Sequence, residues 1–514
     1  MLEPTCLAPH AVARGARATP DAVALEHVGG ARVTYVELDR RARAWAASLA
    51  GRGVAAGDHV ATMLPNADTF DAHVAMLALG WLRAVEVPLN VAFTGRMLAY
   101  ALDHADVTTL VIAPELRDAV AAVEHEVPQL REIVVLDDST RGELDAAAPA
   151  TELEGPEYRD VHSLMFTSGT TGPSKAVITP WAVMYQFWSW VPDDALGVGD
   201  GLYCAMPLFH NSGRSAFNYA MSRNARFVLR DRFSATEFWS DVRATGCVTA
   251  ALVGPMTALL YSAPPTDDDA DSPLRNAILG PMIPEIEDFE RRFGVRVATG
   301  YGQTETGMAV TTGWEHGPWA NCGRLREDYP WPEVRIADEF DEPVTDGDVG
   351  ELLVRSAEPW ALNVGYYKMP EQTAAAWRNG WFHTGDAFRR DDDGWFYFVD
   401  RLRDTIRRRG ENISSFEVET LVAEHPAVRE CAAIGVPAPL GEDDVFVAVI
   451  VDDPAAFEPA QLLEFLETRM PRFMLPRYVE VVDDLPRTEA SMRVRKHELR
   501  DRGVTGTTWD REAT

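Results

Sequence analysis

The segment TSGTTGPSK, Thr167–Lys175, places hydroxyl side chains, glycines and one lysine between two apolar runs. VHSLMF before it and AVIT after it are short and rich in branched residues, which predicts two strands. Gly169 and Gly172 allow the backbone to come close to a ligand. The chain has no Gly-Lys-Ser/Thr triplet here, and Pro173 and Pro180 disfavour a helix on either side. We therefore predict a strand–loop–strand hairpin that holds phosphate.

Length and charge limit the class of protein. With 514 residues and 46% hydrophobic content, the chain can bury a large core and should form more than one domain. Its net charge of -31 opposes a nucleic-acid or anionic-membrane partner, so a small-molecule substrate fits better. The first twenty residues contain no apolar signal region, and Arg83 and Glu86 interrupt the apolar run Met76–Val91. We expect a cytoplasmic protein.

Cysteine and lysine usage gives two further expectations. The cysteines lack metal-ligand spacing, which predicts reduced, mostly buried thiols and no zinc or disulfide framework; they are Cys6, Cys204, Cys247, Cys322 and Cys431. Arginine carries nearly all the positive charge, and Lys175, Lys368 and Lys496 are the only lysines. Any lysine that a reaction requires is therefore one of these three.

Helical and strand patterns alternate through the first half of the chain. Thr34 with Glu37 resembles a capping box that opens a helix ending near Gly53. A strand from His59, a helical run Ala72–Leu82, and the buried strands TLVIAP and EIVVLD follow. This rhythm predicts a layered α/β domain.

The pattern changes in the second half. Short strands with Asp-Gly turns at Asp346 and Asp393 predict a small β subdomain at about residues 329–400. After Arg401 comes a compact α/β tail. We predict an α/β protein with a large N-terminal domain over 1–400 and a small C-terminal domain over 401–514.

A second motif is TGYGQTETG, Thr299–Gly307, which follows the strand-like VRVAT. Glu305 is suited to hold a magnesium ion against phosphate oxygens, and Thr304 to donate a hydrogen bond to them. The competing interpretation, equally weighted from the motif alone, is a polar turn that caps a helix.

Two later motifs are weaker alone. Asp386 in WFHTGDAF can accept hydrogen bonds from both ribose hydroxyls, although Gly-Asp turns are common. Arg401 can reach a ribose or phosphate oxygen. For Arg407 and Arg408 in RRRGEN we prefer a solvated basic turn, whereas Gly410 lets a narrow ligand pass the backbone.

These four motifs, in this order, closely resemble the adenylate-forming superfamily of acyl-CoA synthetases, peptide-synthetase adenylation domains and luciferases. The resemblance covers nearly the whole chain and includes VGELLVRS and GYYKMPEQTAAAWRNGWFHTGD. RRRGENISSFEVE is most similar to the carnitine/crotonobetaine-type CoA ligases. The resemblance implies layered α/β subdomains and a β subdomain in the N-terminal domain, and a mobile α/β C-terminal domain hinged near Arg401–Arg403.

The resemblance also implies a two-step reaction. A carboxylate attacks the α-phosphate of Mg-ATP to form an acyl-adenylate and pyrophosphate, and a thiol such as CoA then displaces AMP. Glu305 would hold the metal, Thr304 the α-phosphate, and Asp386 with Arg401 the ribose. The implied nucleotide-binding residues are Thr167, Ser168, Gly169, Thr170, Thr171, Gly172, Lys175, Tyr301, Gly302, Gln303, Thr304, Asp386 and Arg401.

The hinge and the CoA tunnel also have matching positions. The hinge matches Arg403, where relatives often carry Asp or Lys, and a hinge needs backbone rotation more than a given side chain. Arg409, Gly410 and Glu411 match the tunnel for CoA, and Arg409 stands where many relatives have glycine. This tunnel is therefore expected to be narrower.

The acyl pocket departs from the family pattern. PLFHNSG matches the segment whose aromatic or histidine side chain faces the carboxylate, so His210 is the candidate, with a histidine in a satisfied turn as the alternative. Met282 stands where relatives usually have small residues and would narrow the wall beside the adenine. Tyr185, Phe187, Trp188 and Trp190 form either an aromatic wall or core. We expect a small, aromatic or otherwise short acid; the implied substrate residues are His210, Asn211, Gly280, Pro281, Met282 and Gly307.

The largest departure lies at the C-terminus. Relatives end in PRTxxGKVxK, whose glycine-linked lysine reaches the carboxylate and the α-phosphate, but this chain reads LPRTEASMRVRKHELR. Three explanations stay open. Arg493 substitutes for the lysine, Lys496 is brought in by a change of spacing, or the reaction needs no such lysine. Arg493 presents a bulkier planar fork than lysine.

Alternative functions follow from this departure. One is a diazotase-like enzyme that activates nitrite with ATP for reaction with an aryl amine. Another is a catalytically impaired relative that only binds nucleotide. The main expectation remains an ATP-dependent, AMP-forming acid–thiol ligase with ATP, Mg²⁺ and CoA, as a monomer or homodimer without nucleic-acid or membrane partners.

Overall fold

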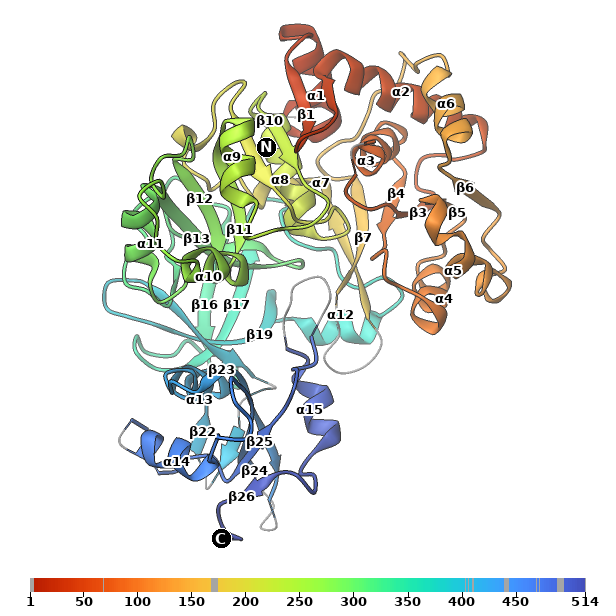
Figure 1. Ribbon diagram of the computed structural model, residues 1–514. Helices are drawn as coiled ribbons and strands as arrows, with labels where there is room; N and C mark the ends of the chain where they lie inside the picture. The colour runs from red at the N-terminus through yellow and green to blue at the C-terminus, as the bar shows by residue number, and fades with distance from the viewer. Residues whose placement is uncertain are drawn as a thin grey trace. The chain divides into compact units, whose positions relative to one another are not determined.

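A computed structural model describes residues 4–67, 69–167, 174–402, 404, 406–408, 411–438, 443–467, 469–470, 472–487 and 494–513 (Figure 1). The chain divides into two compact units. The first comprises the described residues of 4–167, 174–334 and 354–382, and the second those of 335–353 and 383–513. No helix among these residues has the length and apolar character needed to cross a membrane.

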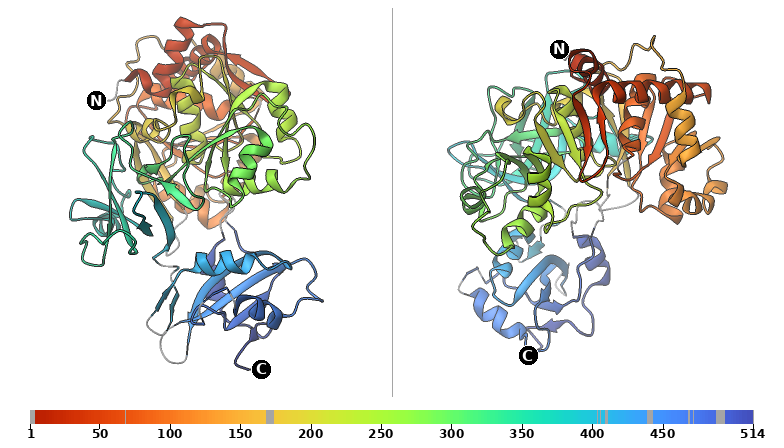
Figure 2. Two further views of the ribbon diagram at one scale, coloured as in Figure 1. Left: turned by 90° about the vertical axis from the view of Figure 1, so that its left-hand side faces the viewer. Right: turned by 45° about the horizontal axis from the view of Figure 1, so that its top comes forward.

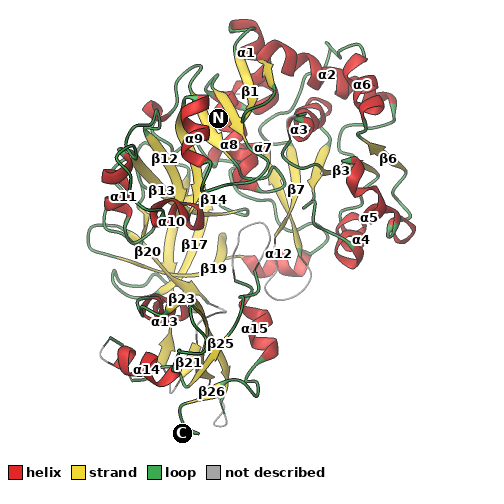
Figure 3. Ribbon diagram, in the orientation of Figure 1, coloured by secondary structure: helices red, strands yellow, loops and turns green. Residues whose placement is uncertain are grey.

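Two sheets build the first unit, and the colours of Figure 3 separate them from the helices. One has the order β6-β5-β3-β4-β7-β8 and is parallel except for the β7–β8 pair. Its strands are β3 (His59–Met63), β4 (Val85–Pro88), β5 (Thr109–Ile112), β6 (Glu132–Val135), β7 (Val161–Thr167) and β8 (Lys175–Pro180).

The other sheet has the order β14-β13-β12-β11-β9-β10-β1-β2, with parallel central strands and one antiparallel strand at each edge. Its strands are β1 (Val23–His27), β2 (Arg32–Thr34), β9 (Gly201–Cys204), β10 (Arg226–Leu229), β11 (Cys247–Val253), β12 (Asn276–Gly280), β13 (Arg296–Gln303) and β14 (Gly307–Thr311).

Helices connect most of these parallel strands, as parallel pairing requires. The α-helices are α1 (Ala8–Ala18), α2 (Tyr35–Gly51), α3 (Asp71–Leu82), α4 (Gly95–His104), α5 (Arg117–Ala121), α6 (Asp138–Ala146), α7 (Trp181–Gln186), α8 (Asn211–Ser222), α9 (Phe238–Thr245), α10 (Gly254–Ser262), α11 (Ile286–Phe293) and α12 (Pro370–Ala376). Short 3-10 turns are η1 (Pro4–Cys6), η2 (Pro114–Leu116), η3 (Glu124–Glu126) and η4 (Asp193–Ala195).

The local predictions for this region are confirmed. The Thr34 hydroxyl accepts a hydrogen bond from the Glu37 amide, and the Glu37 carboxylate accepts one from the Thr34 amide, so the predicted capping box opens α2. Every residue of α3 is buried, as its continuous apolar sequence predicts. The predicted strands and the α/β class are observed.

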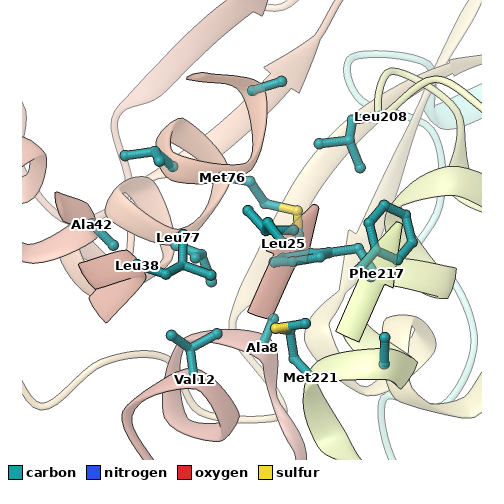
Figure 4. Packing of buried hydrophobic residues seen from close by; sticks show 14 of the residues in the cluster. Ala8, Val12, Leu25, Leu38, Ala42, Met76, Leu77, Leu208, Phe217 and Met221 are labelled. Atoms are coloured by element: carbon teal, nitrogen blue, oxygen red, sulfur yellow. The ribbon is translucent and has the colours of Figure 1, made fainter. Parts of the chain in front are cut away.

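Successive side chains along a strand face opposite sides of the sheet and therefore belong to different hydrophobic clusters. In β3, Val60 faces a cluster with residues of α2 and α3, whereas Ala61 faces a second cluster with residues of α4. Figure 4 shows part of the first cluster, to which Leu38, Met76 and Phe217 contribute from three different helices and in which Met76 lies beside Leu25 of β1. The hydrophobic core therefore lies on both faces of the first sheet.

A buried ion pair between Arg214 of α8 and Glu86 of β4 holds the start of α8 in place. Arg214 donates to the Glu86 carboxylate at 2.5 and 3.1 Å, and its Nε donates to the Leu208 carbonyl at 3.0 Å. Arg214 and Glu86 are 1% and 3% exposed. Burial, and then the charge of Arg214, hold the pKa of His162 well below its usual value. The segment that precedes α8 is therefore anchored to β4.

A third sheet has the order β15-β20-β19-β17-β16, and β18 pairs with β19. Its strands are β15 (Asn321–Gly323), β16 (Pro332–Ala337), β17 (Gly350–Ser356), β18 (Trp377–Arg378), β19 (Trp381–Arg390) and β20 (Phe396–Arg401). Gly347 and Gly394 have positive φ in the two predicted Asp-Gly turns.

The C-terminal segment forms a four-stranded sheet of order β23-β24-β25-β26 (Figure 2). Val445, Val447 and Val449 face a cluster with α13 and α14, and the alternate residues of β24 face a cluster that contains Leu499 of α15. The elements are β21 (Ile406–Arg408), β22 (Glu411–Ile413), α13 (Ser415–Ala423), β23 (Val428–Pro437), β24 (Asp443–Val451), α14 (Pro459–Glu467), β25 (Tyr478–Val481), α15 (Lys496–Arg502) and β26 (Trp509–Asp510).

Candidate active site

The predicted phosphate loop connects an antiparallel pair of strands. Thr167, the last residue of β7, lies opposite Lys175, the first residue of β8. The strand–loop–strand prediction is therefore confirmed. The loop residues Ser168, Gly169, Thr170, Thr171 and Gly172 lie outside the described residues, so their contact with phosphate stays a prediction.

The motif with Thr304 and Glu305 lies in the tight turn between β13 and β14. The turn closes with a hydrogen bond of 3.1 Å from the Gln303 amide to the Thr306 hydroxyl. Strands flank it on both sides, so the alternative of a turn that caps a helix is wrong. The side chains from Tyr301 to Glu305 are half-buried, which leaves them partly open to a ligand.

Glu305 is held through both its backbone and its carboxylate. The Asn363 backbone amide and side-chain Nδ2 donate to the Glu305 carbonyl at 3.0 and 2.7 Å. The Tyr366 hydroxyl donates to Oε1 of Glu305 at 3.2 Å. On the same aromatic ring, Lys175 Nζ lies 4.4 Å from the centroid of Tyr366. The structure thus brings the predicted loop lysine and the predicted metal carboxylate to one side chain.

The end of this turn packs against a glutamine that sequence reasoning missed. Gln186 Nε2 donates to the Met308 carbonyl at 3.0 Å, and the Met308 amide donates to Gln186 Oε1 at 3.2 Å. Gly307 has φ of 63°, and a Cβ there would lie 1.7 Å from Gln186 Oε1. The sequence does place this glutamine in an otherwise apolar helical segment, and a buried amide there indicates hydrogen-bond partners elsewhere in the fold.

The predicted acyl segment lies at the start of α8. His210 precedes the helix as its N-cap residue and is half-buried, and Asn211 is 5% exposed. Neither polar atom of the Asn211 side chain has a hydrogen-bond partner among the residues that the structure describes. A buried amide without partners is costly, so this position calls for a ligand or another polar group.

Among the other predicted pocket residues, Met282, Trp188 and Trp190 are part of the core. Gly280 ends β12, and Met282 is 8% exposed within a hydrophobic cluster that also contains Ile283. Trp188 and Trp190 are 6% and 4% exposed in the main core, which supports the core interpretation over an aromatic wall. The narrowing of the wall by Met282 stays a prediction, as do the contacts of Gly280 and Pro281 with substrate.

Asp386 and Arg401 meet in the second unit. They lie opposite each other on β19 and β20, with Arg401 Nε 3.7 Å from Asp386 Oδ1. Asp386 is 4% exposed and belongs to a strand, so the alternative of a common Gly-Asp turn is wrong. A buried carboxylate with an arginine beside it suits an acceptor of hydrogen bonds from ribose hydroxyls.

Arg408 corrects the prediction of a solvated basic turn. Its side chain is 3% exposed, and its Nε lies 3.0 Å from Asp444 Oδ1. It also donates to the carbonyls of Phe473 and Leu475 at 3.0 and 2.9 Å. The prediction failed because these partners are distant in sequence. The side chain of Arg407 is not among those described.

Lys496, one candidate for the missing lysine, is engaged in an internal contact. It is the first residue of α15, and its Nζ lies 2.5 Å from Ser415 Oγ and 2.8 Å from Glu419 Oε1. Burial raises the pKa of Glu419, and Lys496 opposes that rise. The ion pair gives Lys496 a structural role, and its part in the reaction stays a prediction.

The remaining C-terminal candidates cannot be placed. Arg493, Arg403, Arg409 and Gly410 lie outside the described residues, and Glu411 is described only as the first residue of β22. Their assignments to catalysis, hinge and CoA tunnel stay predictions. The cysteines are free thiols; Cys204 and Cys247 are buried, and the other three are half-buried.

The donor set fits magnesium better than zinc. No group of three or more His, Cys, Asp or Glu side chains that could hold a metal ion occurs among the described residues. Magnesium commonly takes one or two protein carboxylates and completes its shell with water and substrate phosphates. The single carboxylate of Glu305 beside the phosphate-loop strand suits that mode.

Comparison with known families now identifies the chain. The family model "AMP-binding enzyme" matches residues 12–367, and "AMP-binding enzyme C-terminal domain" matches residues 417–491. The chain belongs to the AMP-binding enzyme family. The predicted adenylate-forming superfamily and the class of acyl-CoA-synthetase-like, AMP-forming ligase are confirmed.

Relatives of this AMP-binding enzyme extend along nearly its whole length. The crotonobetaine/carnitine–CoA ligase of Salmonella enteritidis is 29% identical over 482 residues, which cover 90% of this chain and 92% of the relative. The ligase of the same name from Salmonella typhi is 30% identical, with coverages of 87% and 89%.

Solved structures agree in fold. ATP-bound MatB from Rhodopseudomonas palustris superposes with a TM-score of 0.85 at 27% identity, covering 96% of this chain and 99% of that one. The O-succinylbenzoate CoA synthetase of Bacillus subtilis with ATP and magnesium gives 0.82 at 25% identity, with coverages of 96% and 98%. The predicted fold class is confirmed.

Proposed function

We propose that this AMP-binding enzyme uses ATP to activate a short carboxylic acid and transfers the acyl group to CoA. The observation that carries the proposal is the meeting of Lys175 and Glu305 at the ring of Tyr366. A cation and a carboxylate placed together suit a triphosphate with its divalent metal. The CoA ligases among the relatives support CoA as the acceptor.

Each predicted residue then has a role in the proposed reaction. The loop Thr167–Lys175 binds the β and γ phosphates, and the Thr304 hydroxyl donates to the α-phosphate. Asp386 accepts hydrogen bonds from the ribose hydroxyls, and Arg401 lies beside its carboxylate. A magnesium ion held by Glu305 would neutralise phosphate charge during the first step.

The chemistry consists of two displacements. A carboxylate oxygen of the acid attacks the α-phosphorus, and the bond to the bridging oxygen breaks so that pyrophosphate leaves. The thiol of CoA then gives up its proton to solvent and attacks the acyl carbonyl, and the bond from the carbonyl carbon to the phosphate oxygen breaks so that AMP leaves. The protein contributes chiefly positioning and charge stabilisation, because the mixed anhydride already carries a good leaving group.

The environment of α8 supports a short acid with a polar group. The buried Asn211 amide can both donate to and accept from such a group, which would satisfy its two unpartnered atoms. Because Trp188 and Trp190 lie in the core, they give no support for a purely aromatic pocket. Aromatic acids therefore belong in the test panel beside small polar acids.

Release of AMP and pyrophosphate tests the proposal. The full-length protein would be incubated with ATP, Mg²⁺, CoA and a panel of short polar, aromatic and long-chain acids, and acyl-CoA would be measured by mass spectrometry. Acyl-CoA from a short acid is expected. AMP formed only with nitrite and an aryl amine would select the diazotase-like alternative, and no AMP with any partner would contradict both enzymatic readings.

A pair of charge-matched variants controls this experiment. Glu305→Gln removes the carboxylate proposed to bind the metal and should lower kcat by at least about 100-fold, as removal of a single electrostatic contact in a transition state does. Glu327→Gln removes an exposed carboxylate from the same unit and should leave the rate unchanged.

A further inference from the structure

The segment 363–367 extends the first sheet beyond β8. Three backbone hydrogen bonds of 2.8 to 3.0 Å connect it to Ala176 and Ile178, and Tyr366 pairs with Val177 as an antiparallel bridge. Because β8 begins at Lys175, this segment lies directly beside the strand that leaves the phosphate loop. A backbone ladder of this kind fixes the direction of the side chains on it.

The same segment also holds the turn that carries Glu305. Asn363 donates twice to the Glu305 carbonyl, at 3.0 and 2.7 Å, and is itself only 5% exposed. Its carbonyl oxygen Oδ1 accepts a hydrogen bond of 3.3 Å from Trp377 Nε1. The backbone of Glu305 is therefore fixed before any ligand arrives.

Tyr366 contributes two separable interactions from one side chain. Its hydroxyl donates to Glu305 Oε1 at 3.2 Å, and its ring lies 4.4 Å from Lys175 Nζ. The residue is 7% exposed, and a cation–π contact is stronger where water is excluded. The hydroxyl restricts the rotation of the carboxylate, whereas the ring restricts the position of the ammonium.

We propose that Tyr366 is a positioning residue that presents the Glu305 carboxylate and the Lys175 ammonium together to a nucleoside triphosphate and its divalent cation. The identity of that ligand rests on the proposed function. The two interactions predict two distinct defects. Loss of the hydroxyl should weaken binding of the triphosphate only when the metal is present. Loss of the ring should weaken binding both with and without the metal.

Calorimetric titration of ATP, with Mg²⁺ and with a chelator, separates these parts. Tyr366→Phe keeps the ring and should weaken binding of Mg-ATP by about 5- to 10-fold, while binding of metal-free ATP stays unchanged. Tyr366→Leu should weaken both. Electron paramagnetic resonance of Mn²⁺ in the ATP complex gives a second readout, with altered coordination expected in Tyr366→Phe.

Tyr367→Phe is the matched control. The neighbouring Tyr367 hydroxyl also donates to a carboxylate, Asp106 Oδ2, at 2.8 Å, but Asp106 belongs to no predicted site. This variant should bind ATP as the wild type does under both conditions. A general loss of folding would instead appear as lowered thermal stability in Tyr366→Phe relative to Tyr367→Phe.

The outcomes distinguish the two proposals. If Tyr366→Phe binds Mg-ATP as tightly as the wild type, or loses the same factor with and without metal, the inference on Tyr366 is overturned while the proposed function stands. If the wild type binds no ATP, the proposed function fails, and the inference loses its ligand with it.

Discussion

Lys175 and Lys496 are two of the three lysines in this protein, and their surroundings differ in kind. Lys175 lies over the ring of Tyr366, whereas Lys496 lies 2.8 Å from the carboxylate of Glu419. An aromatic ring attracts a cation without neutralising it, so this contact leaves the Lys175 charge able to act on the phosphate that we propose it binds. A buried carboxylate neutralises the charge of the lysine that pairs with it. From these different contacts we expect Lys175 to bind the ligand and Lys496 to have a structural role.

Replacement of Lys496 should give the largest effect and would test the structural half of this comparison. Lys496→Met leaves the Glu419 charge buried without its partner and should destabilise the C-terminal segment by about 3 to 5 kcal/mol. Hydrogen exchange of the peptides that contain α13 and β23 would measure this change. The double variant Lys496→Met with Glu419→Gln should recover most of the protection.

The same variants decide whether Lys496 takes part in the reaction. If the double variant folds and releases AMP at the wild-type rate, Lys496 has only a structural role. If Lys496→Met keeps its exchange protection but loses adenylate formation, the structural assignment is wrong and Lys496 is the replacement lysine.

Replacement of Lys175 tests the other half. Lys175→Met should weaken ATP binding by about tenfold or more, because a charge-assisted hydrogen bond to phosphate contributes roughly 1.5 to 3 kcal/mol. Thermal stability should change little, because Lys175 is half-buried and its contact with the Tyr366 ring contributes little to folding. If calorimetry gives Lys175→Met the same ATP affinity as the wild type, then Lys175 contacts the Tyr366 ring without binding phosphate.

The comparison also predicts a pH dependence. Burial raises the pKa of Glu419 above its usual value, so the folded state binds this proton more tightly than the unfolded state does. Ionisation of Glu419 therefore costs stability as the pH rises through the interval between its unfolded and folded pKa values. Without Lys496 that pKa rises further, because the lysine charge had opposed the shift.

The deficit of Lys496→Met relative to the wild type should accordingly shrink as the pH falls through the interval between the folded and unfolded pKa values of Glu419, by at most about 1.4 kcal/mol per pH unit for one proton. Denaturant unfolding of both proteins across this range measures it. A deficit that is constant with pH would mean that Glu419 does not titrate in this interval.

The third lysine gives the smallest effect. Lys368 Nζ lies 2.6 Å from Asp106 Oδ1, but both side chains are nearly half exposed. Lys368→Met should change the free energy of unfolding by less than about 1 kcal/mol, and the difference should decrease in high salt. A loss as large as that of Lys496→Met would contradict the argument from burial.

Sequence reasoning succeeded where the signal is local. The capping box of Thr34 and Glu37, the apolar helix α3 and the hairpin around Thr167 depend on residues close together in the chain, and each was predicted correctly. Periodicity and turn chemistry carry such information directly. The layered α/β class follows from the same alternation.

The residues that sequence reasoning missed depend on distant partners. No role was predicted for Tyr366, which belongs to the family signature, or for Gln186, which stands between aromatic residues in the sequence. Their partners Glu305 and Met308 come from another part of the chain, so only the fold reveals the contacts. The prediction that Arg408 is solvated was wrong for the same reason, because its partners, Asp444 and two backbone carbonyls, are distant in sequence.

The contact between Gly307 and Gln186 restricts how this family can vary at those two positions. A methyl group at position 307 would overlap the glutamine side chain, since the two atoms would lie 1.7 Å apart. Alanine at 307 thus requires either a shift of the Gln186 side chain or a shorter residue at 186, and either change disrupts the hydrogen bonds to Met308. A side chain at position 307 is therefore expected to accompany a different support for the Thr-Glu turn.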